Sequence, residues 1–296
     1  MTVFFHEPVM VEEVCHFLLR GEGVYVDATV GGGGHARAIL ERLGPSSMLV
    51  GIDRDREALD VAHKTLAPFA SRVRLVHERF SRLRDILALF GIQKVRGILF
   101  DLGVSSWQLE RSERGFSFLR EGPLDMRMDT SWGKTAFDLL RTLSEDELAE
   151  LFFRFGEERY ARRIARAIVR YRKKKPVATT TELSELVARI VPRRRIHPAT
   201  RVFLALRIAV NDELGELERA LAQLPELLEE GGRVVVLSYH SLEDRLVKRY
   251  FRQSSSLQEV TRKPVFPSPE EVRRNPRARS ARLRAAEKVS FLEGKA

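Results

Sequence analysis

Cysteine is almost absent from this chain of 296 residues, because Cys15 is the only one. A single cysteine excludes an intrachain disulfide and any metal site built mainly from thiolates. The scarcity also fits a reducing compartment, since disulfide-rich chains belong to oxidising ones. We expect no metal in this protein.

Long apolar runs are lacking as well. No stretch of the sequence approaches the roughly 20 apolar residues that a membrane-spanning helix needs. The first residues also lack the basic start and the apolar core of a secretory signal. We therefore expect a cytoplasmic protein that does not contact a membrane.

Acidic residues are in deficit. The chain has 41 acidic and 51 basic side chains, which gives a formal net charge of +10. A basic chain of this size often binds a polyanion, so nucleic acid is the favoured partner. The alternative is a charge-rich, thermostable surface, although that would raise both signs together.

A run of glycines is the most informative stretch that is present. An apolar strand is predicted at residues 24–28, and it leads into Gly31-Gly32-Gly33-Gly34-His35, where a helix is expected to begin. Glycine accepts positive φ and lets a ligand approach the backbone, and the first N–H groups of the helix face that ligand. The spacing Gly31-x-Gly33-x-x-Ala36 fits the dinucleotide pattern, which is a weak signal by itself.

Three carboxylates restrict the identity of the ligand more than the glycines do. Asp27, Asp53 and Asp101 each end an apolar run, so parallel strands would bring them to one edge of a sheet. An anionic pyrophosphate would be poorly placed there, whereas the sulfonium and ammonium of S-adenosylmethionine would be well placed. We therefore favour this cofactor over a nicotinamide dinucleotide. Each aspartate alone could instead be a helix cap.

Alternating strands and helices predict the fold. Strands are expected at 23–28, 48–53, 73–77 and 97–101, with helices at 35–43, 56–66 and 83–90, after a lead-in helix within 6–19. Such a series gives an α/β fold with a Rossmann-like parallel sheet and right-handed crossovers. Phe80 follows the third strand, where its ring could cover an adenine or simply join the core.

The loop after the fourth strand suits methylation of an exocyclic amine. An acidic or carbonyl oxygen must hold the amine and stabilise the charge that develops, and Asp101 and the Leu102 carbonyl are the candidates. Methylation of cytosine at C5 would need a cysteine, and Cys15 lies far along the chain from this loop.

The strand rhythm breaks after Gln108, and the next clear buried strand is at 233–238. This gap exceeds one crossover helix, so we expect an all-helical insertion at 109–205 between two parts of a methyltransferase domain, 1–108 and 206–296. Helices are expected from the capping box at Ser144 to Phe155, at 157–173, and after Thr179 to about 191. The basic runs 172–175 and 193–195 are either solvated faces or contacts to a phosphate backbone.

The last third completes the sheet. A basic helix is expected at 199–210 and a crossover helix at 214–230, and the tail at 281–292 is expected to add the final edge strand. His240 follows the fifth strand and could contact substrate. In the other interpretation, Ser241 or Asp244 caps the next helix.

Motifs spread over nearly the whole chain resemble the MraW family of bacterial ribosomal RNA small subunit methyltransferases H. They are His6-x-Pro8-Val9, Asp27-Ala28-Thr29-x-Gly31-x-Gly33-Gly34-His35, Asp53-x-Asp55, Asp101-Leu102-Gly103-Val104-Ser105-Ser106, Gly115-Phe116-Ser117, Pro123-Leu124-Asp125-Met126-Arg127-Met128, His197-Pro198-Ala199-Thr200-Arg201 and Ser238-Tyr239-His240-Ser241-Leu242-Glu243-Asp244.

The resemblance implies N4-methylation of a cytidine in the decoding (P-site) region of 16S rRNA, with S-adenosylmethionine as cofactor. The substrate would be the RNA within the small ribosomal subunit, the insertion would bind it, and a homodimer is left open. Cofactor contacts would fall on Asp27, Gly31, Gly33, Gly34, His35, Asp53, Phe80, Asp101 and Gln108, and Asp101, His240 and Asp125 would act on the substrate. Arg79 departs from the asparagine that is usual before the aromatic residue.

Three other functions stay open at this point. The chain could be a non-catalytic RNA-binding or ribosome assembly factor, which the intact acids at all three strand ends argue against. It could be a nicotinamide-dependent oxidoreductase. It could also be an amino-methylase of another base or of DNA.

Overall fold

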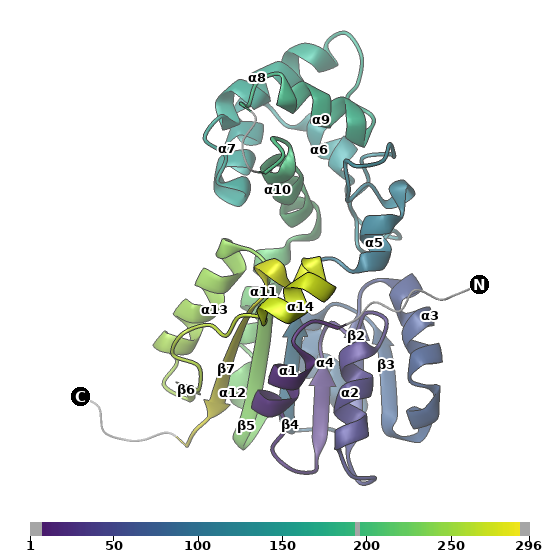
Figure 1. Ribbon diagram of the computed structural model, residues 1–296, viewed down its shortest axis with the longest axis vertical. Helices are drawn as coiled ribbons and strands as arrows, with labels where there is room; N and C mark the ends of the chain where they lie inside the picture. The colour runs from purple at the N-terminus through teal and green to yellow at the C-terminus, as the bar shows by residue number, and fades with distance from the viewer. Residues whose placement is uncertain (1–7, 193–195, 291–296) are drawn as a thin grey trace. The chain divides into compact units, whose positions relative to one another are not determined.

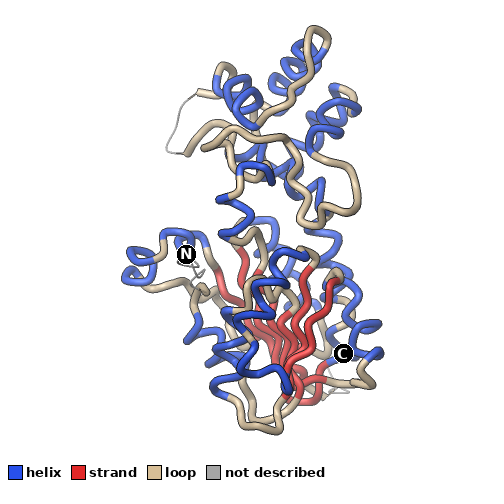
Figure 2. The backbone as a smooth tube through the Cα atoms, turned by 90° about the vertical axis from the view of Figure 1, so that its right-hand side faces the viewer, coloured by secondary structure: helices blue, strands red, loops and turns tan. Residues whose placement is uncertain are grey.

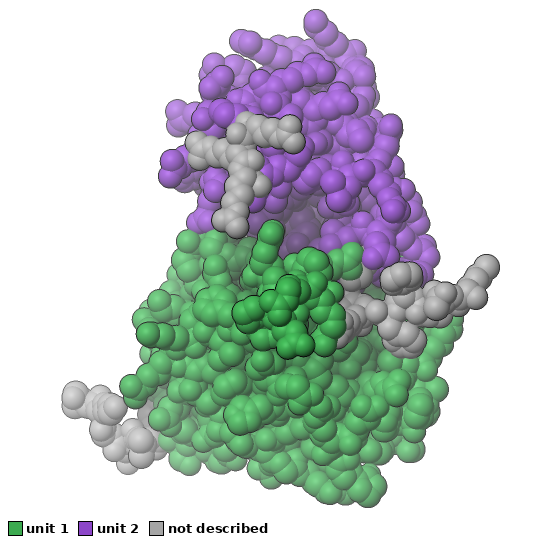
Figure 3. All heavy atoms as spheres, in the orientation of Figure 1, with its two compact units in different colours: residues 1–103, 214–296 green, residues 104–213 purple. Residues whose placement is uncertain are grey.

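The computed structural model describes residues 8–192 and 196–290 (Figure 1). The chain forms two compact units, one of residues 1–103 and 214–296 and the other of residues 104–213 (Figure 3). From the sequence we placed the corresponding boundaries after residues 108 and 205. No helix in the described ranges is both long enough and apolar enough to cross a membrane. The motif residue His6, the basic run 193–195 and the end of the predicted tail strand at 291–292 lie outside the described residues.

The first unit contains one mixed sheet, drawn in red in Figure 2, with the strand order β3-β2-β1-β4-β5-β7-β6. Its strands are β1 Val24–Asp27, β2 Met48–Asp53, β3 Val73–His77, β4 Val95–Asp101, β5 Leu228–Ser238, β6 Leu257–Glu259 and β7 Arg282–Lys288. The first five are parallel, and β7 runs antiparallel to both β5 and β6. This is the expected Rossmann-like α/β fold.

Helices cover both faces of this sheet, as the apolar character of its central strands requires. On one face, α1 Val11–Leu18, α2 Gly34–Arg42 and α3 Arg56–Thr65 bury side chains against Leu99 and Val235. On the other face, α4 Leu83–Leu89, α11 Glu213–Leu221, α12 Leu224–Leu227 and α13 Ser241–Gln253 pack against Ile98 and Val234. Successive residues of β4 and β5 thus point to opposite cores, as strand geometry dictates. The remaining elements of this unit are η1 Ala67–Arg72, η2 Phe80–Arg82, α14 Pro269–Arg274 and η4 Pro276–Ser280.

The second unit is helical within its described residues. It contains α5 Ser106–Glu110, η3 Ser112–Arg114, α6 Ala136–Thr142, α7 Glu145–Gly156, α8 Ala161–Arg172, α9 Thr180–Ala188 and α10 Thr200–Asn211 around their own apolar core. The expected capping boxes open α7 at Ser144 and α9 at Thr179.

Three sequence predictions were wrong in detail. The helix predicted from residue 157 begins at Ala161, because Glu157 takes a left-handed conformation (φ 50°) and caps α7 instead. The crossover helix predicted at 214–230 breaks into α11 and α12, and β5 already begins at Leu228 before a register shift between Val95 and Gly97 of β4. The tail strand β7 is not the edge of the sheet, because β6 pairs along its outer side.

Candidate active site

The glycine turn holds its shape through backbone conformations that suit glycine. Gly31 and Gly33 have φ of 51° and 87°, and Gly33 is the N-cap of α2. The N–H of Gly31 donates to Oδ2 of Asp53 (2.8 Å), which ties the turn after β1 to the end of β2. A Cβ at Gly31 would meet only the carbonyl of Thr29 at 3.8 Å, so the backbone there faces open space. A ligand can therefore approach this turn closely.

Asp53 ends β2 with both carboxylate oxygens in use. Besides Gly31, the N–H of Asp55 donates to its Oδ1 (2.8 Å). Burial raises the pKa of Asp53 to about 6, although the N–H groups of Asp55 and Gly31 lower it. Each oxygen keeps a further lone pair, so the carboxylate can still accept from a sugar hydroxyl.

Asp27 is the most deeply buried of the three carboxylates, with 1% of its surface exposed. Its Oδ1 accepts from the N–H of Thr29 (3.2 Å), whereas its Oδ2 is buried and has no hydrogen-bond partner in the part of the chain that the structure describes. The pKa of Asp27 is raised to about 7, mainly by burial and in smaller part by the charges of Asp101 and Asp53, although His35 and the N–H of Thr29 lower it. A buried, unsatisfied carboxylate oxygen is costly, so this site fits a ligand that brings a positive charge or a donor.

Asp101 ends β4, where one side chain donates a hydrogen bond to it and a second lies close by. The hydroxyl of Tyr239 donates to its Oδ1 (2.7 Å), and Nδ1 of His35 lies 3.4 Å from its Oδ2. Nε2 of His35 lies 2.8 Å from the carbonyl of Val9, which can only accept, so Nε2 carries a proton and Nδ1 faces Asp101. The Asp101 side chain is 18% exposed, so it is fixed in place but still reachable.

Tyr239 and Thr29 are site residues that we did not predict from the sequence. Burial and then the charge of Asp101 raise the pKa of Tyr239 well above its usual value, so its hydroxyl remains a donor at neutral pH. Thr29 accepts the N–H of Asp101 through Oγ1 (2.6 Å) and joins the loop after β1 to β4. Tyr239 stands inside the quoted motif after β5, which was the available signal.

Phe80 lies in η2, just after β3. Its ring packs edge-on against Phe100 with centroids 5.6 Å apart and is only partly buried. One side of the ring therefore belongs to the core, while the remainder stays available to a planar ligand.

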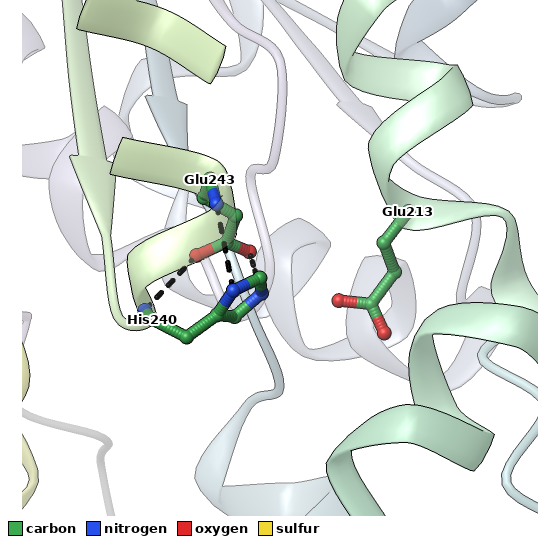
Figure 4. Close-up of side chains that lie close together, drawn as sticks. All are labelled: Glu213, His240 and Glu243. Carbon is green, nitrogen blue, oxygen red and sulfur yellow. Dashed lines mark hydrogen bonds and ion pairs between the residues drawn. The ribbon is translucent and has the colours of Figure 1, made fainter. Parts of the chain in front are cut away.

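His240 is engaged at the start of α13. It is the N-cap, and its Nδ1 accepts from the N–H of Glu243 (3.5 Å), while its Nε2 lies 3.0 Å from Oε1 of the same residue (Figure 4). The Glu243 carboxylate in turn accepts from the N–H of Tyr239 (3.0 Å). The alternative prediction that Ser241 or Asp244 caps this helix is wrong, because His240 is the N-cap and Asp244 pairs with Arg284. These contacts give the His240 side chain a structural role at the start of α13, whether or not it also contacts substrate.

The two remaining candidates belong to the helical unit. Gln108 completes a capping box with Ser105 at the start of α5. Both oxygens of Asp125 accept from Arg127, at 2.8 Å each. The Asp125 carboxylate thus fastens the loop around Met126, a residue in positive φ, and this favours a structural role for it.

Comparison with known proteins places the chain in a family. The model of the MraW methylase family matches residues 3–289. The chain belongs to this family. It is 50% identical to "Ribosomal RNA small subunit methyltransferase H" of Geotalea uraniireducens over 98% of this chain and 100% of that protein. It is 51% identical to the protein of the same name from a Cyanothece species, over 98% and 97%.

Membership identifies an S-adenosylmethionine-dependent methyltransferase and confirms the resemblance, the fold class and the cofactor expected from the sequence. Among solved structures, an rRNA methylase from Streptococcus thermophilus matches with a TM-score of 0.45 at 12% identity, covering 95% of this chain and 94% of that one. That likeness is too weak to add to the fold, which rests on the strand order of the sheet.

Proposed function

We propose that this protein transfers a methyl group from S-adenosylmethionine to the N4 amine of a cytidine in 16S rRNA, in the decoding region of the small subunit, in the cytoplasm. The observation that carries the proposal is the placement of Asp101, whose carboxylate accepts a hydrogen bond from Tyr239 and remains partly exposed at the end of β4. The relatives named as small subunit rRNA methyltransferases support the RNA substrate.

The rim of the sheet supplies the groups that the cofactor needs. The glycine turn would receive the methionine part, with the unsatisfied Oδ2 of Asp27 nearby as a match for positive charge. Asp53 would accept from the ribose hydroxyls, and Phe80 would cover the adenine. When bound, S-adenosylmethionine supplies an electrophilic methyl group on a sulfonium.

Asp101 would accept a hydrogen bond from the target amine. The lone pair of that amine is delocalised into the base, so an adjacent carboxylate helps by stabilising the positive charge that develops on nitrogen. The hydroxyl of Tyr239 would keep the Asp101 carboxylate in position. Cys15 does not support C5 chemistry, because it is buried in α1 and burial raises the pKa of its thiol to about 11.

The helical unit would bind the RNA, and the target base would be swung out of its stack to reach Asp101. A non-catalytic RNA-binding role is the second candidate, since the net charge of +10 alone would serve it.

The test is transfer of a labelled methyl group from S-adenosylmethionine to small subunits from cells that lack this enzyme, and to naked 16S rRNA, followed by nucleoside analysis. We expect labelled N4-methylcytidine, lost on Asp101→Asn and kept on Asp60→Asn, which makes the same change at an exposed position of α3. Label in another nucleoside would refute the cytidine assignment. Cofactor binding without transfer to any RNA would favour the non-catalytic role.

A further inference from the structure

A hollow in the helical unit is lined by cations from two helices. It lies between α8 and α9, has a volume of about 480 Å³, and none of its nine lining residues is acidic. The five cationic residues at its wall are Arg163, Arg166, Arg170, Lys174 and Arg189. We propose that this hollow binds the phosphodiester backbone of single-stranded RNA, an inference that rests on the proposed function.

The cations are spread along the axis of α8 instead of meeting at one position. Arg163, Arg166, Arg170 and Lys174 recur every three or four residues and therefore share one face of α8 and the turn that follows it. Three to four residues rise roughly 5 to 6 Å along a helix, so positive charge repeats along this face. A row of charges matches a polymer whose phosphates also repeat, whereas a single small anion could contact only one or two of them.

Little of this charge is neutralised within the chain. Arg166 lies 3.0 Å from Glu145, and Arg189 lies 3.7 Å from Glu185. Arg170 and Lys174 have no ion-pair partner within residues 8–192 and 196–290, and Arg163 contacts the ring of Tyr160. The lining of the hollow therefore keeps a net positive charge after these two salt bridges are counted. Exposed ion pairs of this kind also add little to the stability of the fold.

The other four lining residues carry no charge. They are Ala167 and Tyr171 of α8, Leu186 of α9, and Ile190 just after α9. Uncharged side chains beside cations suit a nucleotide, whose sugar and base are less polar than its phosphate. This combination distinguishes the hollow from a bare cluster of surface cations.

The basic run at 172–175, which the sequence predicts to be either a solvated face or a contact to a phosphate backbone, divides in the structure. Arg172 donates to the carbonyl of Leu140, and Lys175 lies 2.7 Å from Glu182 and also contacts the ring of Tyr171. Two of its four cations therefore stabilise the helical unit itself. Lys174 is the member that lines the hollow, so the RNA contact runs along α8 instead of along the run.

The experiment compares two double variants that remove the same charge from the same region. Arg170→Gln/Lys174→Gln alters the hollow, and Arg159→Gln/Arg162→Gln alters exposed residues of α8 and the turn before it that do not line it. The probe is a labelled single-stranded fragment of 16S rRNA, titrated at several salt concentrations, with S-adenosylmethionine binding and thermal unfolding measured in parallel.

We expect the hollow variant to weaken RNA binding by on the order of tenfold and to reduce the slope of log K against log salt by about 1.4, because each lost contact to a single strand removes about 0.7. The control variant should stay within about twofold of the unchanged chain, and both should bind the cofactor normally. Arg170→Lys should retain most of the affinity, because the charge remains.

Two results would overturn the inference while leaving the proposed function intact. In the first, the hollow variant methylates and binds RNA as the control variant does. In the second, inorganic phosphate at matched charge competes as well as RNA, which would mark a small-anion site. If the unchanged chain neither binds nor methylates RNA, the proposed function fails and this inference fails with it.

Discussion

Tyr239→Phe tests the active-site geometry most directly, because it deletes one hydroxyl and keeps the ring. That hydroxyl donates to Oδ1 of Asp101 at 2.7 Å, and the Tyr239 side chain is largely buried. A hydrogen bond to a charged group contributes about 1.5–3 kcal/mol when its partner is left without a substitute. Since the Asp101 side chain is 18% exposed and water can replace part of the loss, we take the lower half of that range.

About 1.5–2 kcal/mol corresponds to a fall in rate of roughly 10- to 30-fold. If Tyr239 positions Asp101 for the reacting amine, the loss should appear in kcat, with KM for RNA and the dissociation constant of S-adenosylmethionine nearly unchanged. A merely structural role would instead lower the thermal stability and leave the rate of the folded fraction intact. Single-turnover methyl transfer at saturating RNA and cofactor separates the two.

Tyr250→Phe is the matched control. Tyr250 is a partly buried tyrosine of α13 in the same unit, and it has no hydrogen bond to a site residue among the described residues. It should keep the rate within about twofold. The reasoning is refuted if Tyr239→Phe transfers methyl groups as fast as Tyr250→Phe does, or if its loss of rate only follows its loss of folded protein.

Three further predictions concern charge, backbone and the helical unit. Because the pKa of Asp27 is raised to about 7, the ligand-free folded state holds a proton that the unfolded chain has released, so stability should fall as pH rises from about 4 to about 7. In urea unfolding, Asp27→Asn should remove the share of this loss that Asp27 causes, about 2–4 kcal/mol, and leave the share of Asp53; it should also weaken cofactor binding, and a pH profile equal to that of the unchanged chain would contradict this. Gly31→Ala places alanine at positive φ and should cost roughly 1–2 kcal/mol and weaken S-adenosylmethionine in calorimetry, whereas Gly91→Ala, also at positive φ with open space around it, should cost the same and leave binding unchanged. Asp125→Asn should lower the stability of the chain by about 1 kcal/mol through its pair with Arg127 and leave kcat within about threefold, so a large loss of rate in a folded variant would restore Asp125 as a catalytic residue.

The rim of carboxylates could be predicted because it follows from local rules. Each of Asp27, Asp53 and Asp101 directly ends an apolar run, and parallel strands joined by helices bring their ends to one edge. The glycine turn was predictable for the same reason, since its backbone conformation is fixed by neighbours along the chain. Nothing beyond strand order was needed to place these groups.

Contacts made by the returning chain could not be predicted in this way. Tyr239 reaches Asp101 across 138 positions, because β5 returns beside β4 with Leu237 opposite Asp101. Register between strands so far apart depends on packing on both faces of the sheet, and no local pattern carries it. The strand β6 was missed for a second reason, because a strand of three residues has too little alternation to detect.

The burial of Asp27 has a physical consequence for function. Burial is the largest cause of its raised pKa and the charges of Asp101 and Asp53 act in the same direction, so the ligand-free site keeps this carboxyl at a cost to the stability of the folded chain. Residues at functional sites commonly carry such a cost, and a ligand of opposite charge relieves it. A cationic cofactor should therefore stabilise the first unit through its contacts and, in addition, by relieving this cost. Its binding near pH 7 should release part of a proton. An anionic dinucleotide would instead bring negative charge to these carboxylates, so we expect them to favour the cationic cofactor.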